Sequence, residues 1–484
     1  MQVEQISSWT TGLSVTPPAT GGFGVSLHLV DTDEVPLDRR YRITSKSSYP
    51  SQFTADSDAE NWCAGLWGQN YNPEIAYVGR WAKTATSPYF VCGSPAAFSA
   101  TWTAVTAGDF AVTDGSTTEQ FTTATMAGAT SLADVAAIIE TEVQTSSSFA
   151  ADLSAATVTV DVLGRIVLTS ADTGAEATVY AIIAPTGGSG TDITGATLLN
   201  IASNAFSVAG IDAEDPDDAL AAICAIDNTP FIVTCGSSPS IDQMVALAAA
   251  LQMRKKIGEF KITDANAKNS AYTTDLMSLL SAGGNNNVHC VYTEHTAQQV
   301  DAAICGEIYT RPEGSAGPAF IDLQNMYESG LDPDGITPIP LTDEERLALE
   351  GKGCDYLVKP SSTVHCINGL TPGGIEIRHR IGLYWVDKRC SDAGYALLKS
   401  KAAQNQVVTF SDDDIQALGG IYKSYVDVQV ARKAIEAGYT LSLPSAAEFD
   451  ATVKATHIME LSDIATLMAQ FAVTRLVVTS SATV

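Results

Sequence analysis

Three short apolar runs decide the fold: Phe231-Ile-Val-Thr234, Phe260-Lys-Ile-Thr263 and Val288-His-Cys-Val-Tyr292. Between them, and after the last, apolar residues recur with the 3.6-residue period of an amphipathic helix. These helical faces consist of Ile241, Met244, Val245, Ala248 and Leu251, of Leu276 to Leu280, and of Val300, Ile304 and Ile308. Strands that alternate with helices at this spacing predict a partly parallel sheet covered by helices.

The same alternation occurs nearer the N-terminus. Tyr41-Arg-Ile-Thr44 predicts a strand, and Ile75-Ala-Tyr-Val78 predicts a buried strand that ends at Gly79. Between them, one helical face carries Ala59, Trp62, Cys63, Leu66 and Trp67. We therefore expect residues 23–95 and 211–340 to be two parts of one α/β domain, with a proline-rich loop over residues 310–340.

Residues 96–210 have a different pattern. The apolar period changes to two, and Asp114-Gly115 lies between two β-prone runs, which is typical of a hairpin. One helix is expected, with Ser131 as its N-cap. Arg165 is the only base between Thr84 and Met253, whereas the same stretch holds eighteen acids. The change of period favours a separate β-rich domain inserted into the α/β chain, and the acidic composition fits either an exposed outer domain or an ordinary acidic bias.

Residues 341–472 predict a further α/β domain. Asp355-Tyr-Leu-Val358 and Thr363 to Ile367 have the pattern of strands, and so does Ile375-Glu-Ile377. A long helix is expected from about Leu383 to Ala402, and Ser411 is the N-cap expected for the next one.

The two ends of the chain predict extended arms. Residues 1–22 are polar with scattered apolar side chains, and residues 473–484 are β-prone with no evident pairing strand beside them. The predicted fold class is α/β plus β: a multidomain chain of mixed sheets flanked by helices, with an inserted β-rich domain and extended terminal arms. Such arms can add a strand to the sheet of a neighbouring copy, or they can fold back onto their own domain or fray.

Composition excludes several classes of protein. Of 484 residues, 45% are apolar and 17% are charged, so the chain is neither disordered nor collagen-like. A net charge of −28 argues against direct contact with nucleic acid. No apolar run is long enough for a transmembrane helix, and the first residues lack the pattern of a secretory signal. The nine scattered cysteines are expected to be reduced.

Motifs that carry chemistry are few. The sequence has no phosphate-binding loop, no nucleophile elbow and no C-x-x-C pair. His289, Cys290, Glu294 and His295 are close in sequence, but neighbouring strand residues point to opposite faces, so a metal site is not favoured. We expect no catalytic residue, no cofactor and no metal, and hence a protein that is not an enzyme.

The order of segments resembles that of the contractile-tail sheath proteins of myovirus-type bacteriophages, in the branch with an inserted β-rich domain. The segments that carry the resemblance are Ile75 to Arg80, Trp102 to Gly115, Val135 to Val143, Ile166 to Ala175, Gly353 to Val358, Gly373 to Trp385 and Glu436 to Tyr439, together with the β-prone tail.

The resemblance implies a structural subunit that polymerises as stacked hexameric rings around a tail tube. Such a polymer contracts and drives the tube through the host cell envelope during genome delivery. The implied partners are other copies of the chain, the tail tube protein, and baseplate and tail-terminator proteins, with no direct nucleic-acid contact and no membrane insertion. The implied location is the tail sheath of the virion, after synthesis in the host cytoplasm. Residues 341–472 would form the inner domain beside the tube.

The resemblance also implies that arms of neighbouring copies share a sheet. Carried onto this chain, the arm residues are Val3, Ile6, Trp9, Leu476, Val477 and Val478, and the receiving residues are Tyr356, Val358, Ile375 and Ile377. The first arm is shorter and more polar than the family pattern. Two alternatives remain open: a non-contractile surface or capsid-associated structural protein, and an α/β enzyme whose inserted domain is a lid.

Overall fold

The computed structural model describes residues 23–435 apart from 33–34, 36–38, 50–52, 94–96, 162, 315–316, 320, 333–334, 361 and 406–410, together with residues 439–448 apart from 442 and 444, and the strands 465–468 and 475–478. The chain divides into two compact units. The first unit consists of the chain up to Val30, Arg40–Gly79 and everything from Leu220 onward, and the second consists of Asp31–Arg39 and Arg80–Ala219. The predicted N-terminal arm lies outside the described residues.

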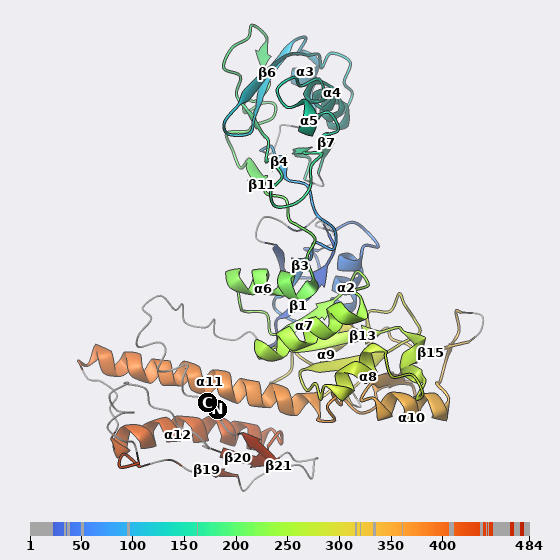
Figure 1. Ribbon diagram of the computed structural model, residues 1–484, viewed down its shortest axis with the longest axis vertical. Helices are drawn as coiled ribbons and strands as arrows, with labels where there is room; N and C mark the ends of the chain where they lie inside the picture. Colours follow the sequence, from blue (N-terminus) through green and yellow to red (C-terminus); the bar gives the residue numbers. More distant parts are fainter. Residues whose placement is uncertain are drawn as a thin grey trace. The chain divides into compact units, whose positions relative to one another are not determined.

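The first unit is built on an eight-stranded sheet with the order β18-β17-β14-β13-β12-β1-β3-β2 (Figure 1). The pairings β1–β12, β12–β13, β13–β14 and β14–β17 are parallel, whereas β2–β3 at one edge and β17–β18 at the other are antiparallel. The partly parallel sheet expected from the strand–helix alternation is therefore confirmed. Its strands are β1 (Ser26–Val30), β2 (Arg40–Ile43), β3 (Ala76–Arg80), β12 (Ile232–Cys235), β13 (Ile257–Ile262), β14 (Val288–Tyr292), β17 (Asp355–Val358) and β18 (His365–Cys366).

Helices cover both faces of this sheet. On one face Leu27 of β1 belongs to a core with side chains of α6, α7, α8 and α10. His28, the next residue, points to the opposite face, where its ring stacks on Trp62 of α2 with centroids 4.9 Å apart. Gly65 of α2 allows close packing on α9, because a Cβ there would lie only 3.0 Å from that of Gln299. These helices are α2 (Asp58–Trp67), α6 (Pro216–Ile226), α7 (Ile241–Met253), α8 (Leu276–Ala282), α9 (Val300–Glu307) and α10 (Asp343–Gly351).

The last third of the chain adds two long helices, α11 (Ile377–Ala403) and α12 (Asp412–Ala431). The strand predicted at Ile375-Glu-Ile377 is wrong, because α11 begins at Ile377, whose side chain is fully buried. Ahead of it, Gly374 has a φ of +84°, which favours a turn rather than a strand. The remaining elements of this unit are η1 (Ala265–Lys268), β15 (Gly330–Leu331), β16 (Pro338–Ile339), β19 (Thr440–Leu441), β20 (Ala465–Met468) and β21 (Arg475–Val478).

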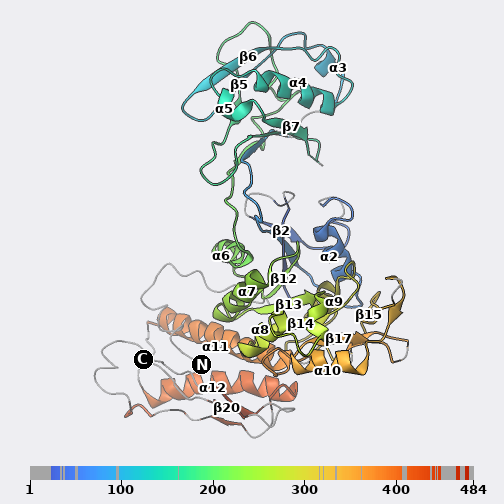
Figure 2. The same ribbon diagram turned by 45° about the vertical axis from the view of Figure 1, so that its right-hand side comes forward.

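The second unit contains two four-stranded sheets (Figure 2). In one sheet β5 pairs with β6, β9 and β10, and the other has the order β11-β4-β8-β7. The hairpin predicted at Asp114-Gly115 is confirmed: Asp114 accepts hydrogen bonds from the backbone N–H groups of Ser116 and Thr117. The elements are β4 (Tyr89–Val91), α3 (Ala100–Thr103), β5 (Gly108–Thr113), β6 (Thr118–Ala124), α4 (Leu132–Gln144), α5 (Ala150–Leu153), β7 (Thr157–Val160), β8 (Ile166–Thr169), β9 (Ala181–Ile183), β10 (Thr191–Asp192) and β11 (Phe206–Val208).

This unit extends beyond the predicted segment 96–210. Glu214 accepts two hydrogen bonds from the Arg39 guanidinium, at 2.9 and 3.0 Å, and its backbone oxygen accepts one from the Trp81 indole at 2.8 Å. These contacts join residues on both sides of the segment, so the compact unit begins and ends outside it.

A carboxylate fixes the loop that follows α4 in this unit. Glu119 on β6 accepts hydrogen bonds from the hydroxyl of Ser146, from the backbone N–H and hydroxyl of Ser147 at 2.8 and 2.9 Å, and from the backbone N–H of Ser148 at 2.9 Å. Partial burial alone would raise the pKa of Glu119, but these hydrogen bonds outweigh it and lower the pKa to about 2.

We expect Glu119→Gln to destabilise this unit by about 1 kcal/mol, because an amide cannot accept all of these bonds. Since the pKa of Glu119 is depressed on folding, its stabilising effect is present above the ordinary carboxyl pKa and is lost as the pH falls toward 2. Hydrogen exchange of the Ser147 and Ser148 amides measures both effects. The exposed Glu176→Gln is the control, and equal exchange in the two variants contradicts the role given to Glu119.

Candidate functional site

The predicted arm residues fall into two groups. Val3, Ile6 and Trp9 lie outside the described residues. Leu476, Val477 and Val478 form most of β21 and pair with Leu467, Thr466 and Ala465 of β20.

The tail therefore has a pairing strand in its own chain, contrary to the sequence-based expectation that none lies beside it. β19, β20 and β21 form a three-stranded antiparallel sheet in that order. Among the described residues, the outer edge of β21 carries no further strand. An open strand edge presents unpaired N–H and C=O groups, which can pair with another chain.

The four predicted receiving residues do not form such an edge. Tyr356 and Val358 lie in β17, which has β14 on one side and β18 on the other: Tyr356 pairs with Tyr292, and Val358 with His365. Ile375 is in no strand, and Ile377 begins α11. The structure therefore does not bring these residues together as one acceptor strand.

A buried charge network lies instead in the middle of this sheet. Glu259 of β13 and His289 of β14 are register partners, and their side chains are completely buried. His289 Nδ1 lies 2.8 Å from Glu259 Oε1, and Nε2 lies 3.3 Å from Asp355 Oδ2 on β17. On the far side of Glu259, the Tyr309 hydroxyl donates to Oε2 at 2.6 Å. A buried imidazole is thus held between two carboxylates.

Asp355 extends this network to the backbone. Its carboxylate accepts hydrogen bonds from the N–H groups of Tyr356 (2.9 Å), Ile367 (3.0 Å), Asn368 (3.2 Å) and Gly369 (2.6 Å). The Gly369 carbonyl in turn accepts the N–H of Ile377 at 3.0 Å, where α11 begins. One buried carboxylate therefore connects the sheet to the turn that starts the longest helix.

The three ionisable groups shift one another's pKa. Burial disfavours the charged form of His289, but the charge of Glu259 and the hydrogen bond to Asp355 raise its pKa to about 10. Burial alone would raise the pKa of Asp355, yet the contacts with His289 and the backbone N–H groups lower it. Burial raises the pKa of Glu259. The favoured state at neutral pH is an imidazolium beside an ionised Asp355.

The His and Cys residues weighed as metal ligands in the sequence do not converge. Both ring nitrogens of His289 face carboxylates, and Glu294 instead pairs with Lys268. Within the described ranges, no group of three or more His, Cys, Asp or Glu side chains is arranged to hold a metal ion. The sequence analysis did not predict this network, although a Glu inside one apolar strand and an Asp at the start of another were a usable signal.

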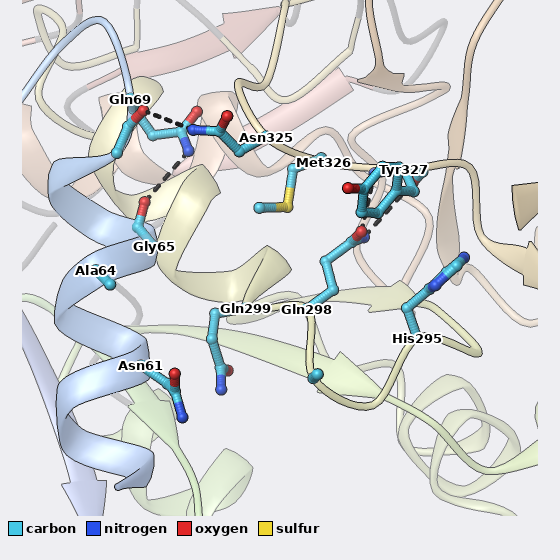
Figure 3. Close-up of a pocket in the computed structure, with 12 residues that line it drawn as sticks. Asn61, Ala64, Gly65, Gln69, His295, Gln298, Gln299, Asn325, Met326 and Tyr327 are labelled. Carbon is cyan, nitrogen blue, oxygen red and sulfur yellow. Dashed lines mark hydrogen bonds between the residues drawn. The ribbon is translucent and has the colours of Figure 1, made fainter. Parts of the chain in front are cut away.

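The first unit also contains a pocket of about 350 Å³ between α2 and the loops that follow β14 (Figure 3). Figure 3 shows Met326 between the α2 wall and the loop that carries Tyr327. The lining of the pocket includes no Asp, Glu, Lys or Arg. The lining residues are Asn61, Ala64, Gly65, Gly68, Gln69, His295, Ala297, Gln298, Gln299, Asn325, Met326 and Tyr327.

Comparison with known proteins gives one specific match. Residues 86–213 match the family described as the insert domain of the E217 tail sheath protein gp31. This range covers most of the second compact unit. A search of curated proteins found no match to the chain.

Several solved structures align with the structure of this chain. A sheath tail protein of Listeria innocua has a TM-score of 0.48 and 9% identity over 98% of this chain and 97% of that one. A sheath tail protein of Desulfitobacterium hafniense has a TM-score of 0.44 and 9% identity, over 96% and 97%. The helical sheath of the anti-feeding prophage in its contracted state has a TM-score of 0.36 and 12% identity, over 58% and 78%. At these scores, no feature of those proteins transfers to this chain.

The matched segment is thus similar to a domain of a phage tail protein. More particularly, residues 86–213 are similar to the insert domain of a tail sheath protein. In the part of the chain that the structure describes, no helix is long and apolar enough to span a membrane.

We expect Asp355→Asn to destabilise the first unit by about 3–5 kcal/mol, because it leaves a buried imidazolium with one carboxylate and weakens the backbone bonds. Hydrogen exchange should show the largest effect at the amides of Ile367, Asn368 and Gly369. Asp343→Asn, which changes a carboxylate that is 96% exposed, is the matched control. Unchanged protection of those three amides would show that Asp355 does not hold the turn.

Proposed function

We propose that this chain polymerises as stacked hexameric rings around a tail tube and contracts to drive the tube through the host cell envelope during genome delivery. The match of residues 86–213 to a tail sheath insert domain supports this proposal, because the matched family is named for a tail sheath protein. The proposed partners are other copies of the chain, the tube protein, and baseplate and tail-terminator proteins. The proposed location is the sheath of the virion tail.

The polymer is held together, in this proposal, by strands shared between copies. The receiving edge is best sought at the three-stranded sheet β19-β20-β21, since β17 has a neighbour on each side. The N-terminal residues Val3, Ile6 and Trp9 of one copy would add a strand beside Leu476–Val478 of another. Each backbone hydrogen bond contributes only about 1 kcal/mol, but several bonds in each of many contacts add up to a strong lattice.

The proposed tube-facing surface is the region of α11 and α12. Twenty of the 27 Lys and Arg residues of this acidic chain lie beyond Met253. Within α11, six bases stand against two acids. Part of this charge is already used inside the chain, as in the Lys388–Asp392 and Lys401–Asp414 pairs. The remaining excess favours a partner with an acidic surface.

The second unit is proposed to be an outer domain that the polymer does not need. It has its own core, which includes Trp102, Phe110, Phe121 and Ile139. Thr86 and Ile211, which lie inside this unit toward its two ends in the sequence, form a β-bridge. Its acidic and nearly base-free composition is that of a surface that faces water.

Deletion of Leu476 to Val484 should leave a folded chain that no longer forms tubes, because β21 and its open edge are removed. Electron microscopy of the purified variant measures polymer formation, and circular dichroism measures retained fold. The control replaces Thr479 to Val484 with a Gly/Ser segment of equal length and should still form tubes. Normal tubes from the deletion variant would refute strand sharing at this end.

Replacement of Tyr89 to Val208 by a short Gly/Ser linker should leave a first unit that unfolds cooperatively, since the Thr86–Ile211 bridge and the Arg39–Glu214 pair are kept. Differential scanning calorimetry and electron microscopy measure the melt and the polymer. Loss of all folded protein would show that the insert is part of the first unit's core.

A further inference from the structure

Helix α9 holds an acid in the interior of the first unit. All eight residues of α9 are buried, and the second of them, Asp301, is only 3% exposed. The helix packs closely on α2 at Gly65, and it also contacts strands β12 and β13 of the sheet. Of the two carboxylate oxygens of Asp301, Oδ1 is buried and accepts no hydrogen bond from any residue that the structure describes.

Asp301 differs from the other buried acids of this unit. Each of the others lies within ion-pair distance of a Lys, Arg or His nitrogen, whereas Asp301 has no such pair in the described ranges. The paired acids are Glu259, Asp275, Glu307, Asp355 and Asp414. A buried carboxylate that has neither water nor a paired cation is costly in its ionised form. Asp301 is therefore the buried acid of this unit for which protonation relieves the most cost.

The charged groups around Asp301 do not remove this cost. Lys261 and Glu259 of β13 and Asp58 of α2 all act on its carboxylate, and only the first is a base. Lys261 Nζ donates instead to a backbone carbonyl and a side-chain amide just before α9, at 3.2 and 3.0 Å. The remaining ionisable side chains of α2, β12 and α9 include no base: they are Glu60, Cys63, Cys235, Cys305 and Glu307.

The histidine of β1 belongs to the same cluster, because the charges of Lys261 and Asp58 act on it as well. His28 Nδ1 lies 2.8 Å from the Thr234 hydroxyl of β12, and Nε2 lies 3.9 Å from Asp58 Oδ1. Burial lowers the pKa of His28 to about 4, so this side chain is neutral between pH 5 and pH 7. Neither β1 nor β12 therefore supplies a positive charge to Asp301 in this pH range.

The balance of these effects decides the sign of the pH dependence. Burial raises the pKa of Asp301 to about 6, although the charge of Lys261 and a hydrogen bond from the Ala302 backbone act to lower it. Since the pKa is raised on folding, bound proton stabilises the folded chain. This stabilisation is fully present below the ordinary carboxyl pKa and is lost as the pH rises through about 6.

We propose that Asp301 is a proton-binding site that sets how firmly α9 is held on the sheet. Uptake of one proton from solvent, as the pH falls from 7 to 5, makes the buried carboxyl neutral and tightens α9. Release of that proton leaves a buried negative charge, which regains water only when α9 moves away from the strands beneath it. The ionised state therefore favours local opening of α9.

Hydrogen exchange of the full-length chain tests the tightening. Asp301→Asn has a side chain of the same size that does not titrate. The protection of the α9 amides in the unsubstituted chain, divided by that in the variant, should therefore rise about tenfold between about pH 7.5 and pH 5. Asp242→Asn is the matched control, because Asp242 is the second residue of α7 but is exposed, and its ratio should stay constant. A constant ratio for Asp301→Asn overturns the proposal.

A direct titration keeps the proposal testable if Asp301→Asn does not fold. Labelling with ¹³C-carbonyl aspartate and ¹⁵N-alanine selects the amides of alanines that follow an aspartate, and Ala302→Gly assigns the signal of Ala302. We expect this signal to titrate with a midpoint near pH 6, against about pH 4 for an ordinary aspartate.

Two charge variants show whether the titrating group is Asp301. Lys261→Gln should raise the midpoint, because it removes the positive charge that favours the carboxylate, and Asp58→Asn should lower it, because it removes a negative one. A midpoint near 4, or a midpoint that neither variant moves, overturns the proposal. The proton site belongs to a single chain, so these outcomes do not depend on polymer formation.

Discussion

The structure of the first unit depends on one buried carboxylate. Asp355 is surrounded by backbone N–H groups of the turn before α11, and it faces His289 across the sheet. Removal of one partner leaves an uncompensated buried charge. This destabilises the fold far more than replacement of the whole pair by apolar side chains would. The sheet and the start of α11 are therefore joined by a continuous set of hydrogen bonds. In the proposed function, in which the lattice of subunits rearranges, this connection would keep the α/β sheet and the start of α11 from moving independently.

The sequence could predict whatever depends on local periodicity. The strands at Phe231, Phe260 and Val288, the helical face with Trp62 and the hairpin at Asp114 follow from spacing and turn chemistry, and the structure has them all. It could not predict contacts between distant segments. The Glu259–His289–Asp355 network joins residues up to 96 positions apart, and the partner of Leu476 lies in a run of four residues with no turn signal beside it. The helix start at Ile377 was missed because two glycines and alternating apolar residues suit a strand equally well.

The placement of the candidate site changes for the same reason. Asp355-Tyr-Leu-Val358 has the composition of a strand, but composition does not tell whether a strand lies at an edge. With β14 and β18 on its two sides, β17 has no free edge, whereas β21 is the last strand of its sheet among the residues that the structure describes. Edge position is a property of the whole topology, and only the assembled sheet reveals it.

Charge adds a constraint on how copies of this chain can meet. With 55 acids against 27 bases, two bodies repel each other unless salt screens them or their contact surfaces are free of acids. Between Thr84 and the end of the second unit, Arg165 is the only basic residue, and such an acidic surface is suited to face water. Residues 5–22 and Leu476–Val484 carry no charged side chain. In the proposed polymer, association through backbone hydrogen bonds of these segments would bring copies of an acidic chain together without placing their carboxylates side by side.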